Sequence, residues 1–185
     1  IDEVRIYESA LSDAEIALLK DETFPCAGVH HYEISHDGTA LSCQPEDLLI
    51  RACSNASCSA LYPGATTLTM SPATGWVGGN TFTFSGGSTT RNFWKTTAGS
   101  ATLGISSNTP TPTSALVCVN TSGGNSCNIN VENAGLLFTA PNVTANKTSA
   151  NFFIQAVKTD EVTKKCIPYF NSANRNIKLW ANYLN

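Results

Sequence analysis

Short segments of alternating apolar and polar residues recur along most of this chain, and they constrain its fold more than any other feature. Such segments return roughly every ten to twelve residues from residue 31 onward, with Gly, Pro, Asn or Ser between them. In EDLLIRAC, for example, the alternation places Leu48, Ile50 and Ala52 on one face. In HHYEIS it places Tyr32 and Ile34 together. This spacing predicts an all-β fold, built as one or more Ig-like antiparallel sandwiches.

Paired glycines separate two sets of these segments. TFTFS and STTRNFWK flank Gly86 and Gly87, and ALVCVN and CNINVE flank Gly123 and Gly124. Both arrangements predict β-hairpins. Two prolines in NTPTPTS then interrupt the pattern. We therefore expect an Ig-like sandwich at 26–107, followed at 108–185 by a second β-unit or by the strands that complete the first.

The first 25 residues differ from the rest. Residues 2–8 alternate as a strand would, and Ser12 precedes Glu15 by three positions, which is a capping box. These features predict a strand followed by one short helix over 12–21. A single strand and a single helix cannot bury a core, so we expect 1–25 to be the end of a larger domain.

Seven cysteines indicate an oxidising compartment. Two pairs are close in sequence and predict local disulfides: Cys53 with Cys58, and Cys118 with Cys127 across a hairpin tip. Cys43 is expected to pair with Cys26 or with Cys166, which leaves one of the three without a partner among them. A zinc site would need matched C-x-x-C pairs, which this spacing does not provide.

Charge and histidine spacing argue against several classes of function. The net charge is −3 and only 14% of residues are charged, so no basic surface is available for nucleic acid. The sequence has no run of eighteen apolar residues, so it predicts no membrane span.

The nearest approach to a metal cluster is formed by His30, His31, His36 and Asp37. However, His30 and His36 would lie about 20 Å apart on a straight strand. We expect no metal and no cofactor.

Catalytic signatures are weak. The sequence contains no G-x-S-x-G nucleophile elbow, and its carboxylates are scattered along the chain. We therefore expect a protein that is not an enzyme.

Aromatic residues leave a carbohydrate-binding function open. Trp76 lies in a predicted turn, and Phe93 and Trp94 are adjacent, so they point to opposite faces and one of them can be exposed. Trp76 and Trp94 are the candidate ligand-facing aromatics, since exposed rings stack on sugars. Core packing is the alternative explanation for the whole aromatic set.

Two resemblances add context. The segment IDEVRIY with the following ALSDAEI resembles the C-terminal end of bacterial laminin-G/concanavalin-like jelly rolls. HYEISHDG (His31 to Gly38), LSCQPE (Leu41 to Glu46), RAC (Arg51 to Cys53) and AVKTD ahead of Cys166 resemble the C-terminal β-rich region of MshQ-type proteins. These are large secreted or surface proteins encoded with the mannose-sensitive haemagglutinin (MSHA) type IV pilus.

The MshQ resemblance implies a cellular location and a group of partner proteins. It implies no chemical activity, because that region has no assigned activity in the family. Together with the cysteines it implies a structural or adhesive module at the bacterial surface or outside the cell. The expected partners are other surface or pilus proteins, a second copy through strand 2–8, or a glycan. A lectin-like domain is the alternative function.

Overall fold

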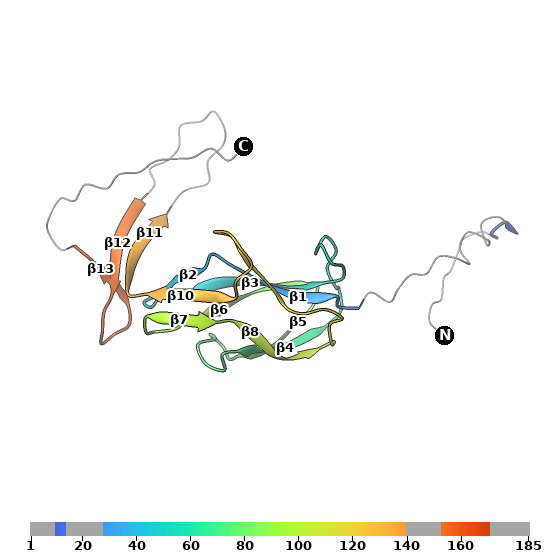
Figure 1. The fold of residues 1–185 in the computed structure, drawn as a ribbon, viewed down its shortest axis with the longest axis horizontal. Coiled ribbons are helices and arrows are strands. Elements are labelled where there is room, and N and C mark those ends of the chain that lie inside the picture. The colour runs from blue at the N-terminus through green and yellow to red at the C-terminus, as the bar shows by residue number, and fades with distance from the viewer. Residues whose placement is uncertain (1–9, 14–27, 140–152, 171–185) are drawn as a thin grey trace, which may run out of the picture.

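The structure is a computed structural model that describes residues 10–13, 28–139 and 153–170. Over these residues the chain forms thirteen β-strands in four sheets (Figure 1). The predicted all-β, sandwich-like class is confirmed. Strand 2–8 and all but the first two residues of helix 12–21 lie outside the described residues. No helix in the described part is long and apolar enough to cross a bilayer.

A four-stranded sheet forms one layer of the main sandwich. Its order is β6–β3–β1–β9, with bounds Ser88–Phe93, Glu46–Cys53, His31–His36 and Val117–Asn120. β1 runs antiparallel to β3 and parallel to β9. It therefore lies between two hydrogen-bonded neighbours, one near in sequence and one more than eighty positions away.

Two three-stranded sheets complete the sandwich, in the orders β5–β4–β8 and β2–β10–β7. Their strands are β2 (Thr39–Leu41), β4 (Thr66–Ser71), β5 (Thr81–Phe84), β7 (Gly99–Thr102), β8 (Gly104–Thr109) and β10 (Asn128–Glu132). Only the buried Leu103 separates β7 from β8, so the chain passes directly from one of these sheets to the other.

One apolar core joins these three sheets. It includes the predicted inward faces of β1 and β3, and side chains from β4, β6, β9 and β10 complete it. Fully buried members from these strands are Tyr32, Ile34, Leu48, Ile50, Leu68, Met70, Phe93, Ile129 and Val131. Since β9 and β10 supply part of this core, residues 117–132 complete the sandwich that begins near residue 28.

The paired glycines do not close hairpins. β5 pairs with β4 and β6 pairs with β3, so Gly86 and Gly87 carry the chain from one sheet to the other. In the same way β9 joins β1, whereas β10 joins β2 and β7. Both predictions of a hairpin are therefore wrong. Flexible glycines permit a sharp reversal, but burying two apolar faces against each other decided which strands pair.

The predicted break at residues 107–114 is the connection that leads back to the four-stranded sheet. The Tyr32 hydroxyl, whose ring is in the core, donates a hydrogen bond of 2.7 Å to the carbonyl oxygen of Pro110. Burial, followed by the charge of Tyr62, raises the pKa of Tyr32 to about 12. The phenol therefore remains a donor throughout the neutral range, and it ties this connection to β1.

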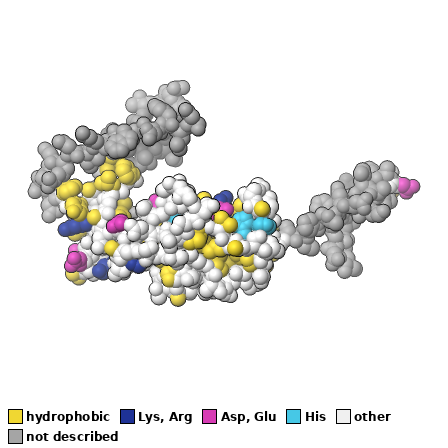
Figure 2. Space-filling model, in the orientation of Figure 1, with side chains coloured by type: hydrophobic (Ala, Val, Ile, Leu, Met, Phe, Trp, Pro, Cys, Tyr) yellow, Lys and Arg dark blue, Asp and Glu magenta, His cyan; other side chains and the backbone are white. Residues whose placement is uncertain are grey.

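A fourth sheet, ordered β11–β12–β13, follows the sandwich. Its strands are Ala134–Thr139, Phe153–Thr159 and Cys166–Pro168. The Cys43–Cys166 disulfide and a hydrogen bond of 2.6 Å between the Ser42 and Thr159 hydroxyls join it to the β2–β3 turn. Figure 2 shows apolar side chains gathered over this sheet, where Leu136 and Phe138 are exposed.

Replacing Tyr32 with Phe tests the tie between β1 and the connection at Pro110. The variant keeps the ring in the core but leaves the Pro110 carbonyl without its donor, so the free energy of unfolding should fall by about 1 kcal/mol. Urea unfolding followed by fluorescence measures the change. Tyr169→Phe, at an exposed position, is the matched control and should change stability by less than about 0.5 kcal/mol. Equal effects of the two substitutions would contradict the prediction.

Candidate functional site

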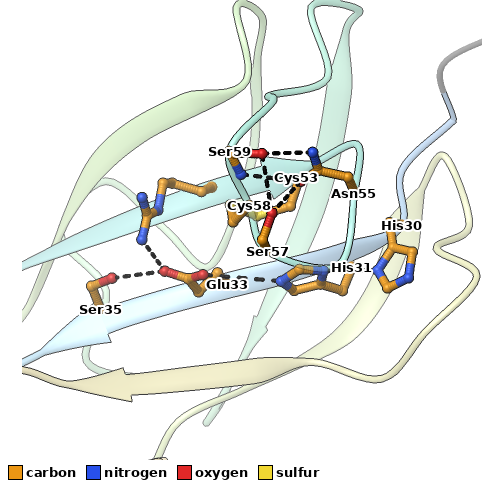
Figure 3. Close-up of polar contacts among 10 residues, drawn as sticks. His30, His31, Glu33, Ser35, Cys53, Asn55, Ser57, Cys58 and Ser59 are labelled. Atoms are coloured by element: carbon orange, nitrogen blue, oxygen red, sulfur yellow. Dashed lines mark hydrogen bonds and ion pairs between the residues drawn. A yellow bond between two sulfur atoms is a disulfide. The ribbon is translucent and has the colours of Figure 1, made fainter.

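The outer face of the four-stranded sheet carries a compact group of polar residues on β1 and β3 (Figure 3). The antiparallel register places His31 opposite Cys53 and Glu33 opposite Arg51. Directly opposed residues point to the same face of a sheet, and here that face is the one turned away from the core. Strand alternation thus brings these four side chains together.

A short loop encloses this face. Residues 54–59 follow β3 and turn back, and the Cys53–Cys58 disulfide closes the loop. Asn55 organises it: its side-chain oxygen accepts a hydrogen bond of 3.0 Å from the Ser59 backbone N–H, and its amide donates one of 2.8 Å to the Ser59 hydroxyl. Although His31 and Glu33 lie on an outer face, they are only 3% and 5% exposed.

Glu33 is held by hydrogen bonds from two side chains. Its Oε1 accepts hydrogen bonds from the Arg51 guanidinium and, at 3.3 Å, from the Ser35 hydroxyl. The other oxygen, Oε2, lies 4.0 Å from His31 Nε2. Removing one partner of a buried ion pair leaves an uncompensated charge, so Arg51 and Glu33 each keep the other in place.

A hydrogen bond joins the rings of His30 and His31. Their Nδ1 atoms lie 3.0 Å apart, so one ring donates and the other accepts. His30 Nε2 lies 3.3 Å from the Ser114 hydroxyl. Burial lowers the pKa of His31, and the neighbouring His30 lowers it further. The His31 imidazole is therefore neutral at pH 7 and available as a hydrogen-bonding or metal-binding group.

In the described residues, these side chains also form a group with the composition of a metal site. Ligand atoms of His31, Glu33, Cys53 and Cys58 all lie within 4.8 Å of one another. With the two sulfurs bonded to each other, however, no thiolate is present. The oxidised protein therefore offers only an imidazole and a carboxylate here.

The histidines that the sequence offered as possible metal ligands lie at opposite ends of β1. His36 Nε2 is 2.8 Å from the Ser126 carbonyl oxygen, and its Nδ1 accepts a hydrogen bond of 3.0 Å from the Gly38 backbone N–H. Sequence reasoning missed the pairing of His31 with Glu33. Their spacing of two residues places both on one face of a strand, but the partners on β3 required the register.

The cysteine pairs follow the predicted pattern in part. The structure bonds Cys53 to Cys58 and Cys118 to Cys127, and it selects Cys166 as the partner of Cys43. Cys26 lies outside the described residues. The Cys118–Cys127 bond does not close a hairpin tip, since Cys118 belongs to β9 and Cys127 directly precedes β10 in a different sheet.

The two candidate tryptophans have different environments. Trp76 is only 7% exposed and packs against Phe93 at a ring-centroid distance of 5.1 Å, while its indole N–H donates to the Pro72 carbonyl oxygen. The expectation of a ligand-facing ring at Trp76 is therefore wrong, because burying this ring in the core satisfies both its apolar surface and its single donor.

Trp94 is half-buried and lines a pocket of about 470 Å³. Its indole N–H donates a hydrogen bond of 2.9 Å to the Ser42 carbonyl oxygen. Thr96, Thr97 and Thr102 also line this pocket. Of the two candidate aromatics, Trp94 is the one that lines this pocket.

An acidic pocket of about 260 Å³ lies where β2, β3 and β10 meet, and Asp37, Glu46 and Glu132 line it. Burial raises the pKa of Glu46 to about 7, and the charges of Asp37 and Asp47 contribute to this increase. Glu46 therefore changes charge near neutrality, unlike an ordinary surface carboxyl.

Two domain families match adjacent parts of the chain. Residues 29–111 are similar to a domain of unknown function (DUF8613), and residues 115–185 are similar to the first Ig-like domain of another domain of unknown function (DUF6701). No curated protein and no solved structure matches the chain. The junction between the two matches falls inside the main sandwich, because β9 and β10 belong to the second match and pack in the core of the first.

Replacing Glu46 with Gln should change how stability depends on pH. The Glu46 carboxyl has an ordinary pKa of 4.5, raised to about 7 in the fold. Between these values the folded state binds more protons than the unfolded state, so this carboxyl makes stability fall as pH rises from about 4.5 to about 7. The variant removes that loss. Above pH 7 it should be more stable than wild type by on the order of 1 kcal/mol after allowance for solvent screening.

Urea unfolding at pH 4, 6 and 8 measures the effect as the difference between variant and wild type. That difference cancels the contribution of His31, whose lowered pKa acts in the opposite direction below about pH 6.5. Glu132→Gln, an exposed position on the same pocket, serves as the control. Parallel pH curves for wild type and Glu46→Gln would rule out the assigned cause.

Proposed function

We propose that this chain is a non-catalytic structural and adhesive module of an extracellular or surface protein associated with a bacterial pilus. The Ig-like match and the three disulfides support an extracellular structural module. The match to the first Ig-like domain of DUF6701 is compatible with the MshQ-type resemblance. The MSHA pilus as its setting is part of the proposal.

The observation that carries the proposal is the long-range disulfide. Cys43 and Cys166 are separated by 123 positions, and their bond encloses β3 to β12, so that of the sandwich strands only β1 and β2 lie outside it. A module that transmits tension along a surface protein must not extend when it is pulled. Tension applied at the two ends passes through this bond and bypasses the residues between its cysteines.

The contacts beside this disulfide position the fourth sheet against the sandwich. The Ser42 hydroxyl lies 2.8 Å from the Asn133 side-chain oxygen, to which it donates, and 2.6 Å from the Thr159 hydroxyl. These groups connect the β2–β3 turn with the ends of β10 and β12. The two units are therefore joined by polar contacts as well as by a covalent bond.

The arrangement of the polar cluster supports a non-catalytic role. Ser114 and His30 are near enough for a nucleophile and a base, but His30 faces another imidazole rather than a carboxylate. A serine–histidine–aspartate site instead needs an acid to orient its base. Glu33, the nearby acid, is engaged by Arg51.

The fourth sheet offers a surface for the proposed protein partners. Leu136 opposes Ala156 and Phe138 opposes Ile154, so these four apolar side chains share one face. Phe138 is 62% exposed. Other surface or pilus proteins are the partners that we propose, and self-association through strand 2–8 is the second mode.

A lectin-like function is the second candidate, and the pocket beside Trp94 favours it. An indole ring next to threonine hydroxyls is a combination that suits a sugar, since the ring stacks and the hydroxyls hydrogen-bond. In this case the domain would bind surface glycans by itself.

Single-molecule extension tests the role of the long-range disulfide. Wild-type protein should extend only through the residues outside 43–166. Replacing Cys43 and Cys166 with Ser should lengthen the unfolded contour by roughly 390 Å, at about 3.6 Å for each residue released, because the two remaining disulfides still hold 5 and 9 of the 123 positions. Replacing Cys118 and Cys127 with Ser is the control and should leave the contour unchanged, because that pair lies inside the enclosed segment. Equal contours for wild type and the Cys43/Cys166 variant would contradict the proposal.

The same variants in the full-length surface protein test adhesion. Bacteria with the Cys43/Cys166 variant should attach normally at rest and detach sooner under flow, because the module extends under load. Equal detachment under flow would refute a tension-bearing role.

Binding to a glycan array separates the two candidate functions. The structural module should show no retained glycan. If the lectin alternative holds, wild type should retain a glycan, and Trp94→Ala should weaken the binding by about 1–3 kcal/mol through loss of stacking. Phe138→Ala, on the apolar face of the fourth sheet, is the control and should leave any glycan binding unchanged.

A further inference from the structure

The Cys53–Cys58 disulfide lies against two further groups that bind metals. His31, Glu33 and the two cysteines bring their ligand atoms within 4.8 Å of one another. Neighbouring ligands of a tetrahedral zinc ion lie about 3.3–3.8 Å apart, given zinc–ligand bonds of about 2.0–2.3 Å. His31 Nε2 and Glu33 Oε2, which lie 4.0 Å apart, are close to this spacing, and the two sulfurs would reach it by separating once their bond is reduced.

We infer that reduction of the Cys53–Cys58 disulfide converts this group into a binding site for a thiophilic divalent cation such as Zn²⁺, with Cys53, Cys58, His31 and Glu33 as ligands. The reductant is a dithiol or two monothiols. It becomes a disulfide, and the protein gains two thiol groups. Binding of Zn²⁺ then releases the two thiol protons to solvent, because thiolates are the ligands.

Charge supports a cation at this position in the reduced protein. Two thiolates and the Glu33 carboxylate carry three negative charges. Zn²⁺ and the Arg51 guanidinium beside Glu33 carry three positive charges. The buried group is then neutral as a whole, whereas two thiolates and a carboxylate without the metal would be costly to bury.

The hydrogen bonds around the site orient the ligands in the required way. When His31 donates from its Nδ1 to His30, its Nε2 carries a lone pair on the side where Glu33 Oε2 lies. Arg51 and Ser35 both engage Glu33 Oε1, which leaves Oε2 for the metal. Partners of this kind fix the tautomer and orientation of metal ligands.

The two sulfurs of this disulfide differ in how accessible they are to a reductant. Cys53 is fully buried at the end of β3, while Cys58 is half-buried in a loop whose neighbours Ser57 and Ala56 are exposed. A reductant therefore attacks the Cys58 sulfur and releases Cys53 as the leaving thiolate. His31, Glu33 and Cys53 are held on paired strands, so only the loop residue Cys58 has to adjust.

The test uses the full chain in a Cys26→Ser background. The protein is reduced under conditions in which mass mapping shows Cys53–Cys58 open and the other two disulfides intact, and the reductant is then removed anaerobically. Titration with Co²⁺ should give the absorption of a tetrahedral ion with thiolate charge transfer, at one ion per chain, and Zn²⁺ should abolish it. The oxidised protein should bind neither ion at this site.

Variants assign the ligands. His31→Ala should weaken Co²⁺ binding by at least about tenfold, and replacing Cys53 and Cys58 with Ser should abolish the charge-transfer band. Replacing Cys118 and Cys127 with Ser is the matched control and should leave the titration unchanged, because that pair is not part of the described ligand group.

Two results would overturn the inference. One is a reduced chain that keeps its near-UV circular dichroism and binds no Co²⁺ at micromolar concentration, or binds it equally well after His31→Ala. The other is loss of the near-UV signal on opening Cys53–Cys58 alone, which would show that this bond is needed for folding and that no preformed site exists in the reduced protein.

Discussion

The two-residue alternation of β1 is the constraint on which the other features depend. One face of this strand places Tyr32 and Ile34 in the core, and the other face presents His31 and Glu33 to the polar cluster. A shift of one residue in its pairing with β3 would exchange the two faces. It would place a carboxylate in the core and an apolar row under the loop that carries Cys58. The core and the candidate site are thus two results of one register.

Much of the fold could be predicted because strand periodicity is local. The inward positions of Leu48, Ile50 and Ala52 followed from alternation alone, and the short spacing of Cys53 and Cys58 indicated their bond. Strand pairing could not be predicted in the same way. Gly86–Gly87 and Gly123–Gly124 have the composition of hairpin turns, yet each connects strands of different sheets, since long-range packing chose the partners.

The candidate site shows the same limit. A histidine and a glutamate two residues apart are ordinary in a strand, and nothing in their spacing distinguishes His31 and Glu33 from other polar pairs. Their importance comes from the antiparallel partner, which supplies Arg51 and Cys53, and from the loop that covers them. Trp76 shows the opposite case. Its position in a turn indicated exposure, but the turn folds inward and packs the ring on Phe93.

The parallel pairing of β1 with β9 has a consequence for the order of folding. β1 cannot gain its second neighbour until the chain has been made as far as residue 120, and the core is incomplete until β10 follows. The segment that resembles DUF8613 therefore depends on strands that belong to the DUF6701 match. During synthesis the earlier segment would remain open until the later one arrives. The two segments can be exchanged between proteins only as a pair, because each contributes side chains to one core and would expose them if it were alone.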